Sequence, residues 1–262
     1  MIHPGDTRRQ VEGLRAHLGA DPARAREIVK ERIALGHESR LYGLRDHARR
    51  TPRHEIDLAG RERIDRALEQ GRGAILWVGR FVFASLIAKM ALHEAGIPVS
   101  HLSRPAHGFA SSEFAIRRLN PIWTRVEERY LRERIVMDPA RPATALRRLH
   151  ARLTENEVVS ISVGDEGVRT TPVSLPIPGG DTAAEGRPIE LATGPITLAA
   201  STGAALIPVF AVREPTRRFR VEIQEPLDVP DLDRVAREDV VARAYGERLA
   251  PFVVCYPGQW IP

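Results

Sequence analysis

The chain has 262 residues, 43% of them hydrophobic, which is enough to bury a sizeable core without requiring a second domain. Its one cysteine, Cys255, excludes an internal disulfide and a multi-cysteine zinc site, and we expect it to be a small core residue. The 39 Lys+Arg and 34 Asp+Glu give a formal charge of +5, and the basic residues are arginines apart from Lys30 and Lys89. Arginine binds phosphate and carboxylate well, so an anionic partner is one interpretation and a GC-rich genome is the other.

Hydropathy argues against insertion into a membrane. No run of about 18 uncharged apolar residues occurs, and residues 1–50 are highly charged. The sequence therefore predicts neither a signal peptide nor a spanning helix. We expect a cytoplasmic protein, or one bound peripherally to the inner face of the membrane.

The first part of the chain has helical patterning. Residues 6–50 place apolar side chains among charges at approximately helical spacing. Asp21 followed by Pro22 is typical of a helix start, with an N-cap residue and a proline in the first turn. Another helix is predicted over 60–70, before a glycine-rich turn. We expect one domain over residues 1–262, in which residues 1–58 form an N-terminal helical segment.

Short apolar runs then alternate with helical patterns. Strands are predicted at residues 74–78, 99–102, 158–163 and 205–210. Helices are predicted at residues 85–95, 143–153, 195–202 and 234–249. This alternation predicts an α/β fold with a mostly parallel central sheet flanked by helices. Residues 219–223 alternate apolar with charged side chains and predict an edge or antiparallel strand.

The segments that follow the apolar runs are the places to look for function, because ligands of open parallel sheets bind beyond the carboxyl ends of the strands. The segments with suitable chemistry are residues 79–85, 103–105, 164–169 and 193–195. The last of these precedes a helix whose free N–H groups could hold an anion. We expect these polar clusters to converge beside an apolar groove.

In their order and spacing, these segments resemble the lipid A lauroyl/myristoyl acyltransferases, a branch of the lysophospholipid acyltransferase superfamily. That family has Gly-His-Phe-Gly-Asn-Trp-Glu after one strand, Arg-Pro after the next, and an acidic-polar pair after a third. Its Thr-Gly-Ala element before a core strand is nearly verbatim in residues 202–210. Residues 256–260 (YPGQW) are similar to the family's terminal Tyr-Pro-Glu-Gln-Trp. The resemblance extends from near Gly60 to the end of the chain.

The resemblance implies a glycerolipid acyltransferase-like fold and transfer of a fatty acyl group from a carrier thioester to a glycolipid hydroxyl. In the family a histidine is the general base, and an acidic residue about one helical turn later orients it. The matching positions here are Arg80 and Ser85. Arginine stays protonated and cannot abstract a proton, and serine cannot orient an absent imidazole.

Three hypotheses follow from this substitution. The first is an acyltransferase with a relocated base, for which His101, His107, Asp165 and Glu166 are candidates. The second is a catalytically inactive homologue that acts as a lipid-binding, acyl-binding or regulatory partner. The third is a different transfer from an activated donor, such as an aminoacyl group, in which Arg80 binds an anion.

The candidate site residues have two sets of roles. The catalytic candidates are Arg80, Ser85, Asp165 and Glu166. The substrate-binding candidates are Arg104, Gly167, Arg169, Thr193 and Gly194. Arg104 matches the family's arginine after the second strand, and residues 166–169 resemble the Glu-Gly-x-Arg phosphate-binding segment of glycerolipid acyltransferases. The structural alternatives are an ion pair for Arg80, helix capping for Ser85, and surface positions for the two histidines.

The sequence has no zinc motif, Walker loop, dinucleotide fingerprint or Gly-x-Ser-x-Gly elbow, so we expect no metal and no cofactor. The expected partners are an acyl donor, either acyl carrier protein or an acyl-CoA thioester, and an acceptor. The acceptor would be an anionic lipid or glycolipid, or another hydroxyl or amine compound. The basic charge makes RNA binding a further hypothesis, although no specific nucleic acid is expected.

Overall fold

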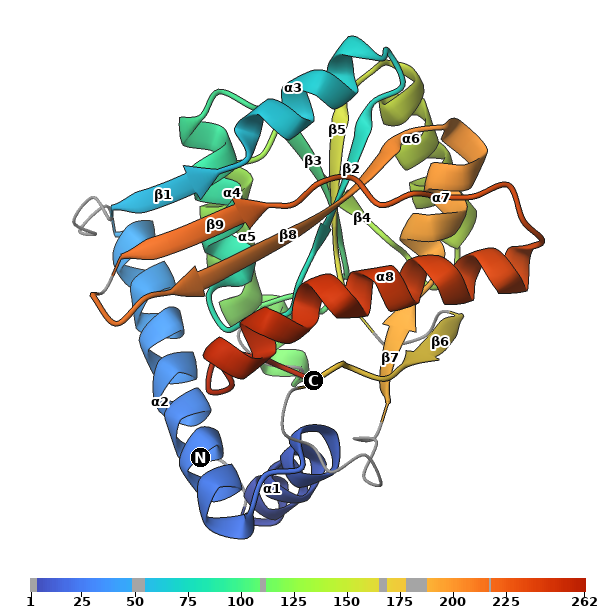
Figure 1. Ribbon diagram of the computed structural model, residues 1–262. Coiled ribbons are helices and arrows are strands. Elements are labelled where there is room, and N and C mark those ends of the chain that lie inside the picture. Colours follow the sequence, from blue (N-terminus) through green and yellow to red (C-terminus); the bar gives the residue numbers. More distant parts are fainter. Residues whose placement is uncertain (1–3, 49–54, 109–111, 165–168, 178–187, 217) are drawn as a thin grey trace.

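The chain folds around a seven-stranded sheet with the strand order β1-β9-β8-β2-β5-β3-β4 (Figure 1). The computed structural model describes the chain except for residues 1–3, 49–54, 109–111, 165–168, 178–187 and 217. The strands of the sheet are β1 (Ile56–Ala59), β2 (Ala74–Val78), β3 (Val99–Ser103), β4 (Glu133–Val136), β5 (Val158–Ser162), β8 (Ala205–Arg213) and β9 (Phe219–Ile223). A separate antiparallel ribbon consists of β6 (Thr170–Val173) and β7 (Ile189–Ala192).

The predicted α/β fold with a mostly parallel sheet is confirmed. Strands β8, β2, β5, β3 and β4 are mutually parallel, whereas β9 is antiparallel to β8. Strand β1 pairs in parallel with β9 on its other side, so β9 is the antiparallel strand that its alternation predicts but it is not at the edge. The sequence pattern missed β1 and β4, because each has only four residues and is only partly buried.

Helices cover both faces of the sheet. They are α1 (Pro4–Leu18), α2 (Pro22–His47), α3 (Arg61–Glu69), α4 (Ala84–Glu94), the π-helical turn η1 (Ala115–Leu119), α5 (Asn120–Glu128), α6 (Pro142–Thr154), α7 (Gly194–Thr202) and α8 (Arg234–Cys255). Figure 1 shows α8 in front of the sheet and α4 and α5 behind it. Helices α4 and α5 therefore lie on the same face of the sheet, opposite to α8.

The N-terminal helical segment packs against the rest of the fold through α2. Asp21 caps this helix as predicted, and its side chain accepts hydrogen bonds from the backbone N–H groups of Ala23 and Arg24 at 2.8 and 3.1 Å. Further along, the Ser39 hydroxyl donates to the carbonyl of Val82, in the segment that leads from β2 into α4. Helix α2 is thus bonded directly to residues 79–85, one of the segments predicted to form the functional site.

The end of α8 corrects one expectation. Helix α8 extends beyond residue 249, through Pro251, to Cys255. Phe252 and Val253 are buried, but Cys255 is exposed, so the prediction that it is a core residue was wrong. Two residues after Val253 the helix has turned by about 200°, which places the thiol on the opposite face. Within the ranges described above, no helix is both long enough and apolar enough to span a bilayer.

Close packing of α2 on α5 gives a test of the fold. A Cβ atom at Gly43 would lie 2.2 Å from the ring of Trp123, whereas one at Gly36 on the same helix meets nothing within 4 Å. We expect Gly43→Ala to lower the free energy of unfolding by about 1–3 kcal/mol, because the indole must move. Gly36→Ala should raise it by roughly 0.5–1 kcal/mol through helix propensity. Urea unfolding followed by circular dichroism measures both, and equal effects would contradict this packing.

Candidate functional site

The segments after the parallel strands come together because those strands are adjacent and run in one direction. Strand β2 pairs with β5 from Ala74 opposite Val158 to Val78 opposite Ser162, and β5 also pairs with β3. The carboxyl ends of all three strands therefore lie on the same side of the sheet, called the carboxyl edge below. The C-terminal segment closes over this edge, where the backbone N–H of Ile261 donates to the carbonyl of Arg80 at 2.9 Å.

Three of the predicted substrate-binding residues, Arg104, Thr193 and Gly194, lie around the end of β5. A Cβ atom at Gly164 would lie 2.9 Å from Nη2 of Arg104, so this exposed arginine crosses from the end of β3 to the end of β5. Buried Thr193 donates its backbone N–H and its hydroxyl to the carbonyl of Arg169, at 3.0 and 3.3 Å. Gly194 is the first residue of α7.

Not every predicted residue faces the same way. The guanidinium of Arg169 donates from Nε to Glu238 on α8 at 3.1 Å, on the front of the sheet in Figure 1. Ser85 lies on α4, behind the sheet. Asp165, Glu166 and Gly167, the predicted acidic and glycine residues after β5, lie outside the described residues. 

A charged cluster is buried beside α4. Ser85 and Lys89 are one helical turn apart on α4, and both face Glu127 of α5. The Ser85 hydroxyl donates to Oε1 of Glu127, and the Lys89 ammonium lies 2.9 Å from the same oxygen and 3.3 Å from the serine oxygen. The Nε2 atom of His107, from the loop after β3, lies 2.7 Å from the other carboxylate oxygen. Ser85 therefore does not cap the helix as its sequence position suggested.

The electrostatics of the cluster are dominated by burial and by opposite charge. The side chain of Glu127 is 1% exposed and that of Lys89 is 4% exposed. Burial alone would raise the pKa of Glu127, but the charge of Lys89 and the contact with His107 hold this pKa well below its usual value. Burial lowers the pKa of Lys89, and Glu127 opposes that shift. The carboxylate thus stays ionised because the ammonium is beside it.

The two histidines were expected at the surface, and His101 is not there. It is buried on β3, and its Nδ1 atom lies 2.8 Å from the hydroxyl of Ser160 on the neighbouring strand. Burial, followed by the positive charge of Lys89, keeps the pKa of His101 well below its usual value, so its ring is neutral. By contrast, the His107 side chain is 28% exposed, with one ring nitrogen on Glu127. Within the described part of the chain, its Nδ1 atom has no hydrogen-bond partner.

Sequence reasoning missed Lys89 and Glu127. Lys89 carried a usable signal, because it is a lone charge in the otherwise apolar stretch from Leu86 to Leu92. Glu127 carried none, because it is followed by a second glutamate, Glu128, and only packing decides which of them is buried. Among the described residues, no group of three or more His, Cys, Asp or Glu side chains could hold a metal ion.

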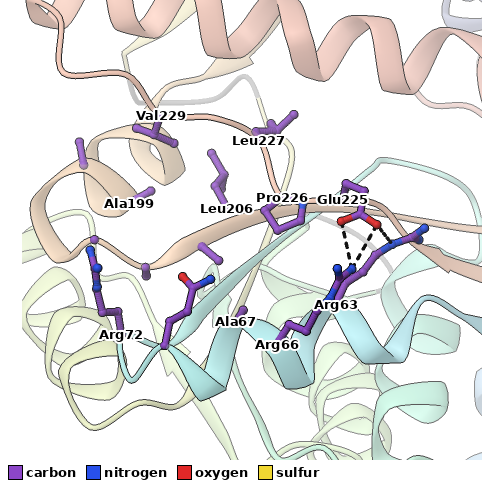
Figure 2. A pocket seen from close by; sticks show the side chains of 15 residues that line it. Arg63, Arg66, Ala67, Arg72, Ala199, Leu206, Glu225, Pro226, Leu227 and Val229 are labelled. Atoms are coloured by element: carbon purple, nitrogen blue, oxygen red, sulfur yellow. Dashed lines mark hydrogen bonds and ion pairs between the residues drawn. The ribbon is translucent and has the colours of Figure 1, made fainter.

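A cavity of about 430 Å³ lies away from the carboxyl edge, between α3, α7 and the amino-terminal start of β8 (Figure 2). Arg63 and Arg66 share the carboxylate of Glu225 there, at 2.7 and 3.2 Å. Arg72 lies against Gly203, where α7 ends. Arginines are stabilised at helix C-termini by the exposed carbonyl groups. The end of α7 therefore accounts for Arg72, and Glu225 accounts for Arg63 and Arg66. The cavity is separate from the buried cluster.

Comparison with protein families gives a match over most of the chain. The profile of the bacterial lipid A biosynthesis acyltransferase family matches residues 44–261. This range contains the sheet, α4, α5 and the whole buried cluster, and it leaves out α1 and most of α2. A search of curated proteins found no match to this chain.

The buried ion pair predicts how stability depends on Glu127. We expect Glu127→Gln to lower the free energy of unfolding by roughly 3–5 kcal/mol, because the buried ammonium of Lys89 loses its counter-charge. Because the folded pKa of Glu127 lies below the unfolded value, its ionised form stabilises the fold above about pH 4.5, and this contribution is lost as pH falls. The variant should therefore lose less stability than the wild type on acidification. Urea unfolding between pH 3.5 and 7 measures both effects.

The control for this measurement is Glu128→Gln. Glu128 is half-exposed and contacts only Arg134 at 3.8 Å among the described ion pairs, so the change should cost less than about 1 kcal/mol. Equal losses in the two variants would contradict the proposed burial of charge at residue 127.

Proposed function

Because the chain belongs to the bacterial lipid A biosynthesis acyltransferase family, we propose that it transfers an acyl group from a thioester donor, with His107 as the general base. The observation that carries this proposal is the contact of 2.7 Å between Nε2 of His107 and the buried carboxylate of Glu127. A carboxylate at one imidazole nitrogen orients the ring and stabilises the imidazolium that forms when the other nitrogen takes a proton. The pair has the chemistry of the family's histidine and acid, supplied from other positions.

The position of Ser85 supports this relocation. By resemblance, residue 85 is where the family has its acidic residue, and here the Ser85 hydroxyl is hydrogen-bonded to the carboxylate of Glu127. The cluster thus keeps a carboxylate beside the first turn of α4, although it comes from α5. His107 enters from the loop after β3, at the edge of the sheet where ligands of such folds bind.

The proposed reaction is a single acyl transfer. Nδ1 of His107 accepts the proton of the acceptor hydroxyl or amine while that oxygen or nitrogen forms a bond to the thioester carbonyl carbon. The C–S bond then breaks, and the imidazolium returns the proton to the leaving thiolate. Lys89 keeps Glu127 ionised throughout, so the carboxylate stabilises the imidazolium without taking its proton.

The substrates that we propose are those implied by the family resemblance. The donor would be acyl carrier protein or an acyl-CoA thioester, and the acceptor an anionic lipid, glycolipid or other hydroxyl or amine compound. Arg80 and Arg104, at the ends of β2 and β3, would hold anionic groups of these substrates, with Thr193 and Gly194 near the end of β5. Arg169, whose guanidinium is bonded to Glu238 of α8, would contribute its backbone carbonyl to the position of Thr193. Asp165, Glu166 and Gly167 remain candidates for the same site. We propose that the protein acts in the cytoplasm or at the inner face of the membrane.

A second function is an inactive homologue that binds acyl chains or lipids. It is favoured by Arg80, which stands where the family's histidine would be. It is also favoured by the ion pair between Lys89 and Glu127, because both charges are buried and neutralise each other. Purified protein incubated with acyl carrier protein thioesters and candidate acceptors separates the two functions. Binding without turnover above the buffer rate would favour the inactive homologue.

We expect His107→Gln to lower the rate of acyl transfer by about 10²–10⁴, because glutamine cannot accept the proton. The folded protein should remain, because residue 107 is in a loop and its side chain is partly exposed. The matched control is His150→Gln, at an exposed position on α6, which should leave the rate unchanged. Equal rates in the wild type and His107→Gln would eliminate His107 as the base.

The histidine and the acidic residue of the family can be restored at positions 80 and 85, but Glu127 already occupies the space beside residue 85 with a negative charge. Arg80→His with Ser85→Glu would place two carboxylates side by side with Lys89 as their one close ammonium. Like charges at this distance disfavour each other, so we expect this double variant to be less stable than the wild type. Adding Glu127→Gln should recover stability and allow acyl transfer in a His107→Gln background. Thermal unfolding and single-turnover transfer measure the two outcomes, and a double variant as stable as the wild type would contradict the predicted repulsion.

A further inference from the structure

Arg32 on α2 carries two buried donors that nothing in the described chain satisfies. Its Nε and Nη2 atoms are removed from solvent and have no hydrogen-bond partner among the described residues. Burial lowers the pKa of this guanidinium to about 10. Arg32 as a whole is partly buried, but proteins seldom leave donors that are removed from water without a partner. The family match begins at residue 44, so Arg32 lies outside it.

The two unsatisfied atoms form one edge of the guanidinium. The N–H groups of Nε and Nη2 are parallel and spaced to match two oxygens of a carboxylate or phosphate. A single unsatisfied nitrogen could be filled by a water molecule. A pair of parallel cationic donors is instead the arrangement that binds an oxyanion through two hydrogen bonds.

The position of Arg32 relates it to the candidate site. It lies on the face of α2 that also carries the buried residues Leu35 and Ser39. Ser39 is bonded to the carbonyl of Val82, between β2 and α4, and Arg32 precedes it by seven residues, or nearly two turns of about 5.4 Å. Figure 1 shows α2 at the side of the sheet toward which β8 runs, and Glu38 pairs with Arg213 at the end of β8. This part of α2 therefore lies beside the ends of β2 and β8.

We propose that Arg32 binds a phosphate group of a substrate through its Nε and Nη2 atoms. The identity of the ligand as a substrate rests on the proposed acyl transfer, whereas the binding of phosphate does not. The two thioester donors proposed above carry phosphopantetheine, and an anionic lipid carries a phosphorylated headgroup, so a phosphate ester is their shared chemistry. Both donors are covered by the protein, so the anion can reach them only if the groups that cover them move aside.

The test compares Arg32→Met with Arg40→Met in thermal unfolding of the full chain. Methionine keeps the apolar stem of Arg32 and removes the unpaired charge, so without ligand the Arg32→Met variant should melt at a higher temperature than the wild type. Arg40 is exposed on the same helix, so its substitution makes the same change of net charge away from the buried face. Arg32→Lys is the second variant, because it keeps the charge and loses the two-pronged edge.

The ligands are used in pairs at matched ionic strength, together with inorganic phosphate. 4′-Phosphopantetheine is compared with pantetheine for the donor, and glycerol 3-phosphate with glycerol for the acceptor headgroup. At tenfold excess over Kd, the phosphorylated member should raise the melting temperature of the wild type and Arg40→Met by about 3 °C or more. Arg32→Met should not respond, and Arg32→Lys should respond less. The pair with the larger shift identifies the source of the phosphate.

Three results would overturn the proposal: no response of the wild type to any phosphate compound, a response of Arg32→Met equal to that of the wild type, or a ligand-free Arg32→Met that melts below the wild type. The last result would show that the guanidinium has a structural role. The His107→Gln variant separates this inference from the proposed reaction. If it loses acyl transfer and keeps the phosphate response, both stand, and if the wild type responds to phosphate without transferring acyl groups, only the proposed reaction fails.

Discussion

The buried ion pair between Glu127 and Lys89 is the constraint on which the candidate site depends. Both charges are almost fully removed from water, so neither is tolerable without the other. The pair attaches α5 to α4, and it fixes the carboxylate that both Ser85 and His107 contact. The chemistry proposed for this protein is therefore inseparable from the packing of two helices behind the sheet.

This arrangement changes how the substituted family motif is interpreted. Arg80 and Ser85 by themselves suggest a site that has lost its general base. In the folded chain, Ser85 is instead part of a network that brings an imidazole and a carboxylate together from two other segments. A substitution at a motif position can thus be compensated by residues more than twenty positions away, and inactivity does not follow from the motif alone.

The N-terminal helices also acquire a meaning that their composition does not convey. In the structure α2 runs along the body of the fold, with Ser39 on the backbone after β2 and Gly43 against the ring of Trp123. Its buried face also carries Arg32, whose unsatisfied donors are its least expected feature.

The sequence by itself determined the elements with strong local signals. The apolar runs at 74–78 and 205–210, the helices between them and the Asp21 cap all follow from hydropathy and capping chemistry, which act over a few residues. Short β1 and β4 lacked such a signal. The site depends on contacts between residues distant in sequence. Packing buries Glu127 and not its neighbour Glu128, and the position of β3 between β5 and β4 buries His101, whereas His107 lies in the loop after β3. Only the tertiary structure decided these points, because burial and charge pairing are properties of the assembled chain rather than of any local pattern.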